Sequence, residues 1–131
     1  MIRLLVCGSR EITDYDFVYN YIKRLCTGRV IDCIISGMAR GVDTYAAEYA
    51  QNNGLKLLEF PITKEDWNLH GKKAGYLRNK KQRDEGNPTH VLAFLHKDFP
   101  CNGTKSMIKL AQEKNIPVKV VMYNKSKGEE Q

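Results

Sequence analysis

The chain has 131 residues, 42% of them hydrophobic, which is the size of one domain and enough apolar material for one core. Its formal net charge is +6, and its four cysteines form no C-x-x-C pair and lie at no metal-ligand spacing from the three histidines. These features argue against a second domain and against a metal or redox role for the cysteines. We expect reduced structural thiols, no metal and no cofactor.

The first predicted element is an apolar run at residues 2–7, which reaches Gly8 and is too short to span a membrane. We expect it to be a buried strand of a cytoplasmic protein that has no membrane partner. Further apolar runs of strand length follow at residues 30–35, 55–60, 90–95 and 118–123. Most of them are continuous rather than alternating, which is typical of strands buried on both faces.

Helical stripes of apolar residues lie between these strands, at residues 17–25, 42–50 and 107–111. The basic stretch at residues 72–85 is a fourth expected helix with a thin apolar face, and Trp67 before it is expected in a polar loop. Tyr45 and Tyr49 belong either to the core or to an interface between copies, so a homo-oligomer remains an alternative.

Five strands that alternate with four helices predict a single Rossmann-like α/β domain, with a parallel β-sheet sandwiched by helices. We expect this domain to cover residues 1–123 and a polar C-terminal tail to cover 124–131. In such sheets, ligands bind outside the carboxyl ends of the strands, where the strand order reverses. That rule selects the loops at residues 8–10, 36–43 and 100–104.

These loops are built to receive an anion. Gly37 and Gly41 permit close backbone approach and positive φ, and a helix that starts near Gly41 directs unpaired N–H groups into the crevice. Arg10 and Arg40 would clamp a phosphate through paired hydrogen bonds. Asp43 would repel a phosphate, so it either caps its own helix or accepts hydrogen bonds from ribose hydroxyls. Gly103 and Thr104 repeat the anion-binding arrangement before the last helix, where Thr104 caps the helix or donates its hydroxyl.

The positive charge is concentrated in residues 72–83, which hold six of the 21 basic side chains and no acid. This stretch is either an anion-binding surface, with weak nucleic-acid binding, or a solvated helix face. Trp67 is either a packing anchor or a platform for a base, and His70 is either a phosphate donor or a surface residue. The chain lacks both the G-x-G-x-x-G and the G-x-x-x-x-G-K-[ST] fingerprints, which argues against a dinucleotide dehydrogenase and an NTPase.

Four motifs in order, VCGSR, SGMARGVDTYAAEYA, WNLHGKKAGYLRNKK and CNGT, closely resemble the YspA-type branch of the SLOG superfamily. Its relatives include the LOG phosphoribohydrolases and the DNA-processing protein Smf/DprA. The resemblance covers residues 1 to about 123 and implies a Rossmann-like fold with a pocket for nucleotides or their derivatives. It implies ligand contacts at Gly8, Ser9, Arg10, Ser36, Gly37, Arg40, Gly41, Asp43, Trp67, His70, Lys72, Arg78, Asn79, Gly103 and Thr104.

The resemblance to the LOG enzymes breaks down at one position. Their pattern G-G-x-G-T-x-x-E has a carboxylate where this chain has Met107, so catalysis would need Asp43 or Glu11 as a substitute. We therefore expect a binding protein rather than an enzyme, which senses or sequesters a small ligand such as a nucleotide sugar, an ADP-ribose derivative or a cyclic signalling nucleotide. The alternatives are a LOG-type N-glycosidic hydrolase and a single-strand nucleic-acid binder of Smf/DprA type.

Overall fold

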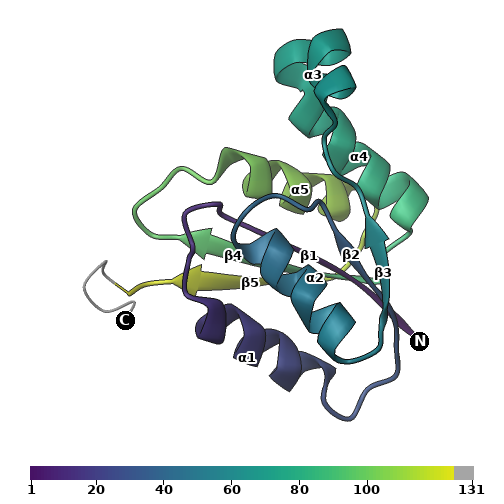
Figure 1. Ribbon diagram of the computed structural model, residues 1–131, viewed down its shortest axis with the longest axis vertical. Helices are drawn as coiled ribbons and strands as arrows, with labels where there is room; N and C mark the ends of the chain where they lie inside the picture. Colours follow the sequence, from purple (N-terminus) through teal and green to yellow (C-terminus); the bar gives the residue numbers. More distant parts are fainter. Residues whose placement is uncertain (126–131) are drawn as a thin grey trace.

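The computed structural model describes residues 1–125 and has three layers, with a parallel sheet between two pairs of helices (Figure 1). Residues 126–131, which make up most of the expected tail, lie outside the described part. The strands are β1 (Ile2–Gly8), β2 (Ile31–Ser36), β3 (Lys56–Glu59), β4 (His90–His96) and β5 (Val118–Tyr123). The helices are α1 (Tyr15–Cys26), α2 (Val42–Asn52), α3 (Lys64–His70), the short 3-10 helix η1 (Gly71–Lys73), α4 (Ala74–Gly86) and α5 (Asn102–Glu113).

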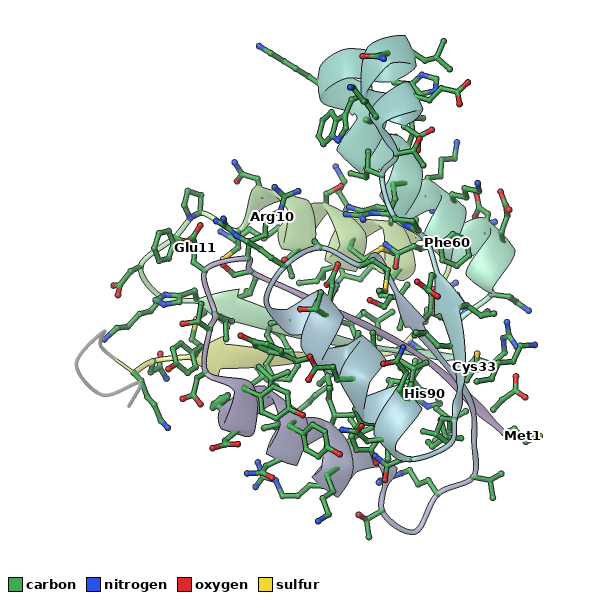
Figure 2. All side chains as sticks on the ribbon, viewed as in Figure 1. Met1, Arg10, Glu11, Cys33, Phe60 and His90 are labelled. Atoms are coloured by element: carbon green, nitrogen blue, oxygen red, sulfur yellow. The ribbon has the colours of Figure 1, made fainter. Side chains whose placement is uncertain are left out.

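The sheet has the strand order β3-β2-β1-β4-β5, and every strand pair is parallel. The predicted Rossmann-like α/β domain is therefore confirmed. The chain leaves β1 toward β2 and returns from β3 to β4 on the other side of β1, so the strand order reverses between β1 and β4. Arg10 and Glu11 lie beyond the carboxyl ends of the strands, whereas Met1, Cys33 and His90 lie toward the other ends (Figure 2).

Each face of the sheet has its own core. On one face, α1 and α2 cover β1, β2 and β4 with a cluster that includes Ile22, Ala46 and Phe94. Tyr49 belongs to this cluster and Tyr45 packs against it, so both tyrosines contribute to the core of a single chain. On the other face, α5 covers the sheet through a second cluster, and α4 packs mainly against α5. The continuous apolar strands predicted this burial on both sides.

Helix α3 departs from the sequence-based prediction, because Trp67 lies within a helix rather than in a polar loop. A capping box starts this helix: the Thr63 hydroxyl accepts from the backbone N–H of Asp66, and the Asp66 carboxylate accepts from that of Thr63. No residue of α3 is buried, and α3 extends from the domain together with η1 and the start of α4 (Figure 1). We call this projection, residues 64–77, the arm.

The basic stretch is helical, as predicted, but its charged side chains differ in burial and in ion pairing. The Arg83 side chain is buried and pairs with Asp84 at 2.8 Å and with Glu113 of α5 at 3.1 Å. Lys72, Lys73, Lys80 and Lys81 are exposed instead. Within residues 1–125, no helix combines the length and the hydropathy that a bilayer crossing needs.

Candidate functional site

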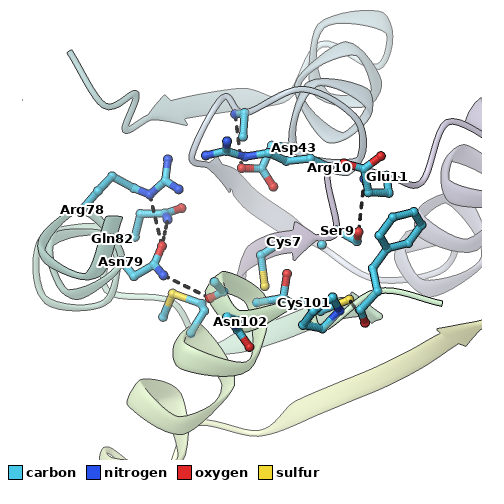
Figure 3. A pocket seen from close by; sticks show the side chains of 17 residues that line it. Cys7, Ser9, Arg10, Glu11, Asp43, Arg78, Asn79, Gln82, Cys101 and Asn102 are labelled. Carbon is cyan, nitrogen blue, oxygen red and sulfur yellow. Dashed lines mark hydrogen bonds between the residues drawn. The ribbon is translucent and has the colours of Figure 1, made fainter. Parts of the chain in front are cut away.

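A pocket of about 360 Å³ opens where the strand order reverses, beyond the carboxyl ends of β1 and β4 (Figure 3). We call it the switch pocket. Four segments line it: the end of β1 with its loop, the loop after β2 with the start of α2, one face of α4, and the first turns of α5 with the loop before them. The lining residues are 7–11, Ala39, Asp43, Arg78, Asn79, Gln82, 99–104 and Met107.

The N-terminus of α5 forms one wall of the switch pocket. Its N-cap residue Cys101 has φ 55° and makes no side-chain capping bond, and the first turn of α5 contains no acidic residue. A Cβ on Gly103 would meet nothing within 4 Å, so the backbone there is open to close approach. An uncapped helix N-terminus presents N–H groups and a partial positive charge, which suit an anion.

Arg78, Asn79 and Gln82 of α4 form the adjoining wall. Arg78 Nε donates to Asn79 Oδ1 at 3.1 Å, and Arg78 Nη1 donates to the Gly37 carbonyl oxygen at 2.7 Å. Asn79 Nδ2 donates to the Gly103 carbonyl oxygen at 3.2 Å. Helix α4 thus joins the loop after β2 to the first turn of α5, so it holds the two sides of the pocket together.

Asp43 is the buried acid of the site, with only 5% of its surface exposed. Its Oδ2 accepts a hydrogen bond from the Ala39 backbone N–H at 3.3 Å. Burial raises the pKa of this carboxyl from its usual 3.8 to about 6, against the opposing influence of Arg78 and, more weakly, Arg10. Asp43 therefore gains or loses its proton at mildly acidic pH. It also lines the switch pocket, where a ligand can contact it.

Two of the predicted residues shape the loop after β2 rather than line the switch pocket. Ser36 is fully buried, and its hydroxyl donates to the Asp43 carbonyl oxygen at 2.8 Å and accepts from the Met38 N–H at 3.1 Å. Gly41 has φ 80°, and a Cβ there would lie 2.9 Å from the Ile12 carbonyl oxygen. Glycine is needed at this position because the loops after β1 and β2 touch there.

A second hollow, of about 410 Å³, adjoins the switch pocket and shares Arg10 and Arg78 with it. Gly37, Arg40 and Trp67 also line this outer hollow. The Arg40 side chain is 71% exposed and forms an ion pair with Glu11 at 2.9 Å. Of the two arginines, Arg10 lines both the switch pocket and the outer hollow, whereas Arg40 does not line the switch pocket. Trp67 reaches the hollow from the arm and is 45% exposed.

The remaining predicted positions lie on the arm. His70 lines a third pocket, of about 540 Å³, between α3, α4 and the end of β3. Lys72 is exposed on η1, outside the residues that line these three pockets. The structure therefore brings eight predicted residues together in the switch pocket: Gly8, Ser9, Arg10, Asp43, Arg78, Asn79, Gly103 and Thr104.

Sequence reasoning missed several lining residues, above all Gln82. A signal existed, because Gln82 follows Asn79 by three residues and Arg78 by four in a predicted helix, and such residues share one face. Cys7 and Met107 also line the pocket and were visible only as core residues. Phe99 and Pro100 come from a loop whose sequence carries no periodic pattern.

Comparison with known structures identifies the same fold in DNA processing protein A (DprA) from Streptococcus pneumoniae, with a TM-score of 0.52. The match covers 90% of this chain and 58% of that chain at 19% identity, so this chain spans just over half the length of that protein and the likeness concerns the fold alone.

Comparison of sequences gives a nearer relative and a family. The Gene 61 protein of Mycobacterium phage D29 is 33% identical over 126 residues, which cover 90% of this chain and 94% of that protein. A family model described as "YspA, cpYpsA-related SLOG family" matches residues 2–70, the part that supplies the loops after β1 and β2. These matches confirm the resemblance noted in the motifs, and the chain belongs to the YspA, cpYpsA-related SLOG family.

Proposed function

We propose that this protein binds a small phosphorylated, nucleotide-derived ligand in the switch pocket and acts as a cytoplasmic sensor or sequestering protein. The candidate ligands are a nucleotide sugar, an ADP-ribose derivative and a cyclic signalling nucleotide. One observation carries the proposal: an uncapped helix N-terminus and Arg10 line the same pocket at the switch point of a parallel sheet. The Arg10 guanidinium makes no hydrogen bond or ion pair with the residues that the structure describes, 1–125.

The anionic part of the ligand would bind between Arg10 and the first turn of α5, which includes Gly103 and Thr104. Backbone N–H groups and a guanidinium together provide directed donors and positive charge for a phosphate. Asp43 lies in the same pocket and would accept hydrogen bonds from ribose hydroxyls. Arg40 and Trp67 would contact a ligand long enough to extend into the outer hollow.

The switch pocket is at the lower end of the size range for small-molecule sites, about 300–1,000 Å³. Isothermal titration calorimetry with AMP, ADP-ribose, UDP-glucose and cyclic AMP tests the proposal directly. We expect micromolar or tighter binding of at least one of them, lost when Arg10 and Arg78 are both replaced by alanine. If none binds, and mass spectrometry finds no nucleotide released from protein purified from its native host, the proposal is wrong.

A hydrolase is the second candidate, and the observation that favours it is the location of Asp43. Met107 occupies the position of the LOG-type glutamate and is buried, but Asp43 supplies a carboxylate with a raised pKa in the same pocket. N-glycosidic hydrolysis needs such a group to activate water or to stabilise positive charge on the sugar. Release of free base from a nucleoside 5′-monophosphate, abolished by Asp43→Asn, would favour the hydrolase over the binding protein.

A further inference from the structure

The side-chain oxygen of Gln82 is a buried acceptor that no donor of the described residues reaches. Gln82 is 2% exposed and lines the switch pocket. Its Oε1 has no hydrogen-bond partner within residues 1–125. Figure 3 shows its amide turned from α4 toward the interior of the pocket. A buried carbonyl oxygen that no donor satisfies is uncommon in folded proteins, so this atom indicates a place where a ligand donates.

The neighbouring hydrogen bonds determine which atom of the Gln82 amide is free. Arg78 Nε can only donate, so the Asn79 atom that it contacts at 3.1 Å is the oxygen. The Gly103 carbonyl can only accept, which is consistent with Asn79 Nδ2 facing it at 3.2 Å. Gln82 Nε2 then donates to Asn79 Oδ1 at 3.4 Å. A flipped Gln82 would set two oxygens against each other, so Oε1 is the atom left for a ligand.

The part of the ligand that lies next to Gln82 Oε1 must donate a hydrogen bond, because this atom can only accept one. A phosphate mainly accepts hydrogen bonds at neutral pH, and the site proposed for it is Arg10 with the first turn of α5. Two other buried side chains of the pocket, Cys7 and Met107, are uncharged, and burial raises the pKa of the Cys7 thiol far above its usual range. An apolar ring that carries an N–H group matches a wall of this kind better than a sugar phosphate does.

We infer that Gln82 is the base-recognition residue of the switch pocket and accepts a hydrogen bond from the exocyclic amine of an adenine-type nucleobase. This inference rests on the proposed function, because it assigns the base end of the same ligand. An amine offers hydrogens and no competing carbonyl oxygen, which suits a wall where Gln82 Nε2 is occupied by Asn79 Oδ1 and only Gln82 Oε1 remains to interact with a ligand.

The test is a thermodynamic cycle that removes the donor from the ligand and the acceptor from the protein. The ligands are AMP and purine ribonucleoside 5′-monophosphate, which has hydrogen in place of the amine, with ribose 5-phosphate as the ligand without a base. The protein variants are the unaltered chain, Gln82→Met, which keeps the length of the side chain but removes the acceptor, and Gln112→Met, a matched control at an exposed glutamine of α5.

We expect Gln82→Met to weaken the binding of AMP about tenfold or more. Removing the amine from the ligand should weaken its binding to the unaltered protein by a similar factor. Removing the Gln82 acceptor and the amine together should cause no further loss of affinity. Affinity for ribose 5-phosphate should not change, and Gln112→Met should change none of the three. A general folding defect would lower the affinity for all three ligands together, so the cycle distinguishes such a defect from the loss of one hydrogen bond to the base.

If Gln82→Met weakens the binding of AMP and of purine ribonucleoside 5′-monophosphate equally, or weakens that of ribose 5-phosphate by the same factor, the inference is overturned while nucleotide binding remains in place. Failure of AMP to bind while ribose 5-phosphate binds would also overturn it. If none of the three ligands binds to the unaltered protein, the proposed function fails for this ligand class and the inference fails with it.

Discussion

The guanidinium of Arg78 lies directly against Gly37. Its Nη1 donates to the Gly37 carbonyl oxygen at 2.7 Å, and a Cβ at position 37 would lie 2.6 Å from the same nitrogen and 2.9 Å from Asp43 Oδ2. Gly37 is outside the left-handed region, whereas Met38, with φ 61°, and Gly41, with φ 80°, lie in it in the same loop. The absence of a side chain at position 37 therefore makes room for Arg78, which in turn faces both the switch pocket and the outer hollow.

Gly37→Ala should weaken ligand binding by displacing Arg78. We expect a loss of roughly 1–2 kcal/mol in binding free energy, the size of a hydrogen bond to a charged group, measured by calorimetry. The same substitution in an Arg78→Ala background should cost little more. Gly75→Ala is the control, since a Cβ at position 75 meets nothing within 4 Å. Full additivity of the two losses would show that Gly37 acts independently of Arg78.

Arg10 and Arg40 should contribute unequally to anion binding. Arg10 lines both hollows, whereas Arg40 lines only the outer one of these two and is held by Glu11 at the surface. We expect Arg10→Ala to reduce affinity for a nucleoside monophosphate by roughly 1.5–3 kcal/mol and Arg40→Ala to reduce it by less than about 1 kcal/mol. Calorimetry on both variants measures the difference, and the reverse order would assign the phosphate to the outer hollow.

Asp43 should make stability depend on pH. Its pKa is about 6 in the folded chain against 3.8 in its ordinary state, so the folded state binds more protons between these values and loses stability as pH rises through them. The full difference is about 3 kcal/mol, and stability should be constant above the folded pKa. Denaturant unfolding of Asp43→Asn should lack this decline. Asp98→Asn, which removes an exposed carboxylate outside the pocket, controls for the loss of one charge.

Asp43 should also make ligand binding depend on pH, with the sign set by its charge. The protonated carboxyl does not repel an anion, so affinity for cyclic AMP, whose single charge is constant over this range, should rise as pH falls through about 6. In Asp43→Asn the dependence should disappear. A rise of the same size in the Asn variant would assign the effect to another group.

Nucleic-acid binding, if it occurs, should depend on four exposed lysines of the arm and α4. Lys72, Lys73, Lys80 and Lys81 face solvent, while Arg83 is occupied by Asp84 and Glu113 and should affect stability instead. We expect weak oligonucleotide binding with a slope of log affinity against log salt near −0.7 per phosphate contacted. Replacing the four lysines by glutamine should abolish it and leave mononucleotide affinity nearly unchanged. Tight, salt-resistant binding of single strands would instead support the nucleic-acid alternative.

The sequence predicted secondary structure best where burial of apolar side chains dominates. Continuous apolar runs predicted all five strands within one or two residues. For the central strands β1, β2 and β4 the reason is burial on both faces of the sheet, whereas the edge strands β3 and β5 are partly exposed. The loops at the carboxyl ends were identified because glycines and arginines cluster where parallel strands end. Trp67 was misassigned because α3 buries nothing, so its sequence has no apolar stripe, and only the Thr63–Asp66 capping pair indicated a helix.

The side-chain roles within the site depended on distances that no periodicity encodes. Arg78 and Arg83 belong to the same basic stretch, yet one reaches Gly37 of another loop and the other pairs with Glu113 of α5. The charges of both looked available to a partner until the packing of α4 was known. The same packing turns Gln82, an ordinary polar residue in sequence, into a buried pocket wall.

Helix α4 is fastened much more firmly at its end than at its beginning. Arg3, at the start of β1, donates to the Gly86 carbonyl oxygen at 2.7 Å and to that of Asn87 at 3.1 Å, and it is itself held by Asp32 at 2.6 Å. In the part of the chain that the structure describes, the arm at the other end has no such anchor in the sheet. The free energy of local opening should therefore rise along α3, η1 and α4. Amide hydrogen exchange should be fastest in α3 and η1 and slowest near Gly86. We expect the pocket-lining turn around Asn79 to be the point beyond which amides exchange only when the whole domain unfolds.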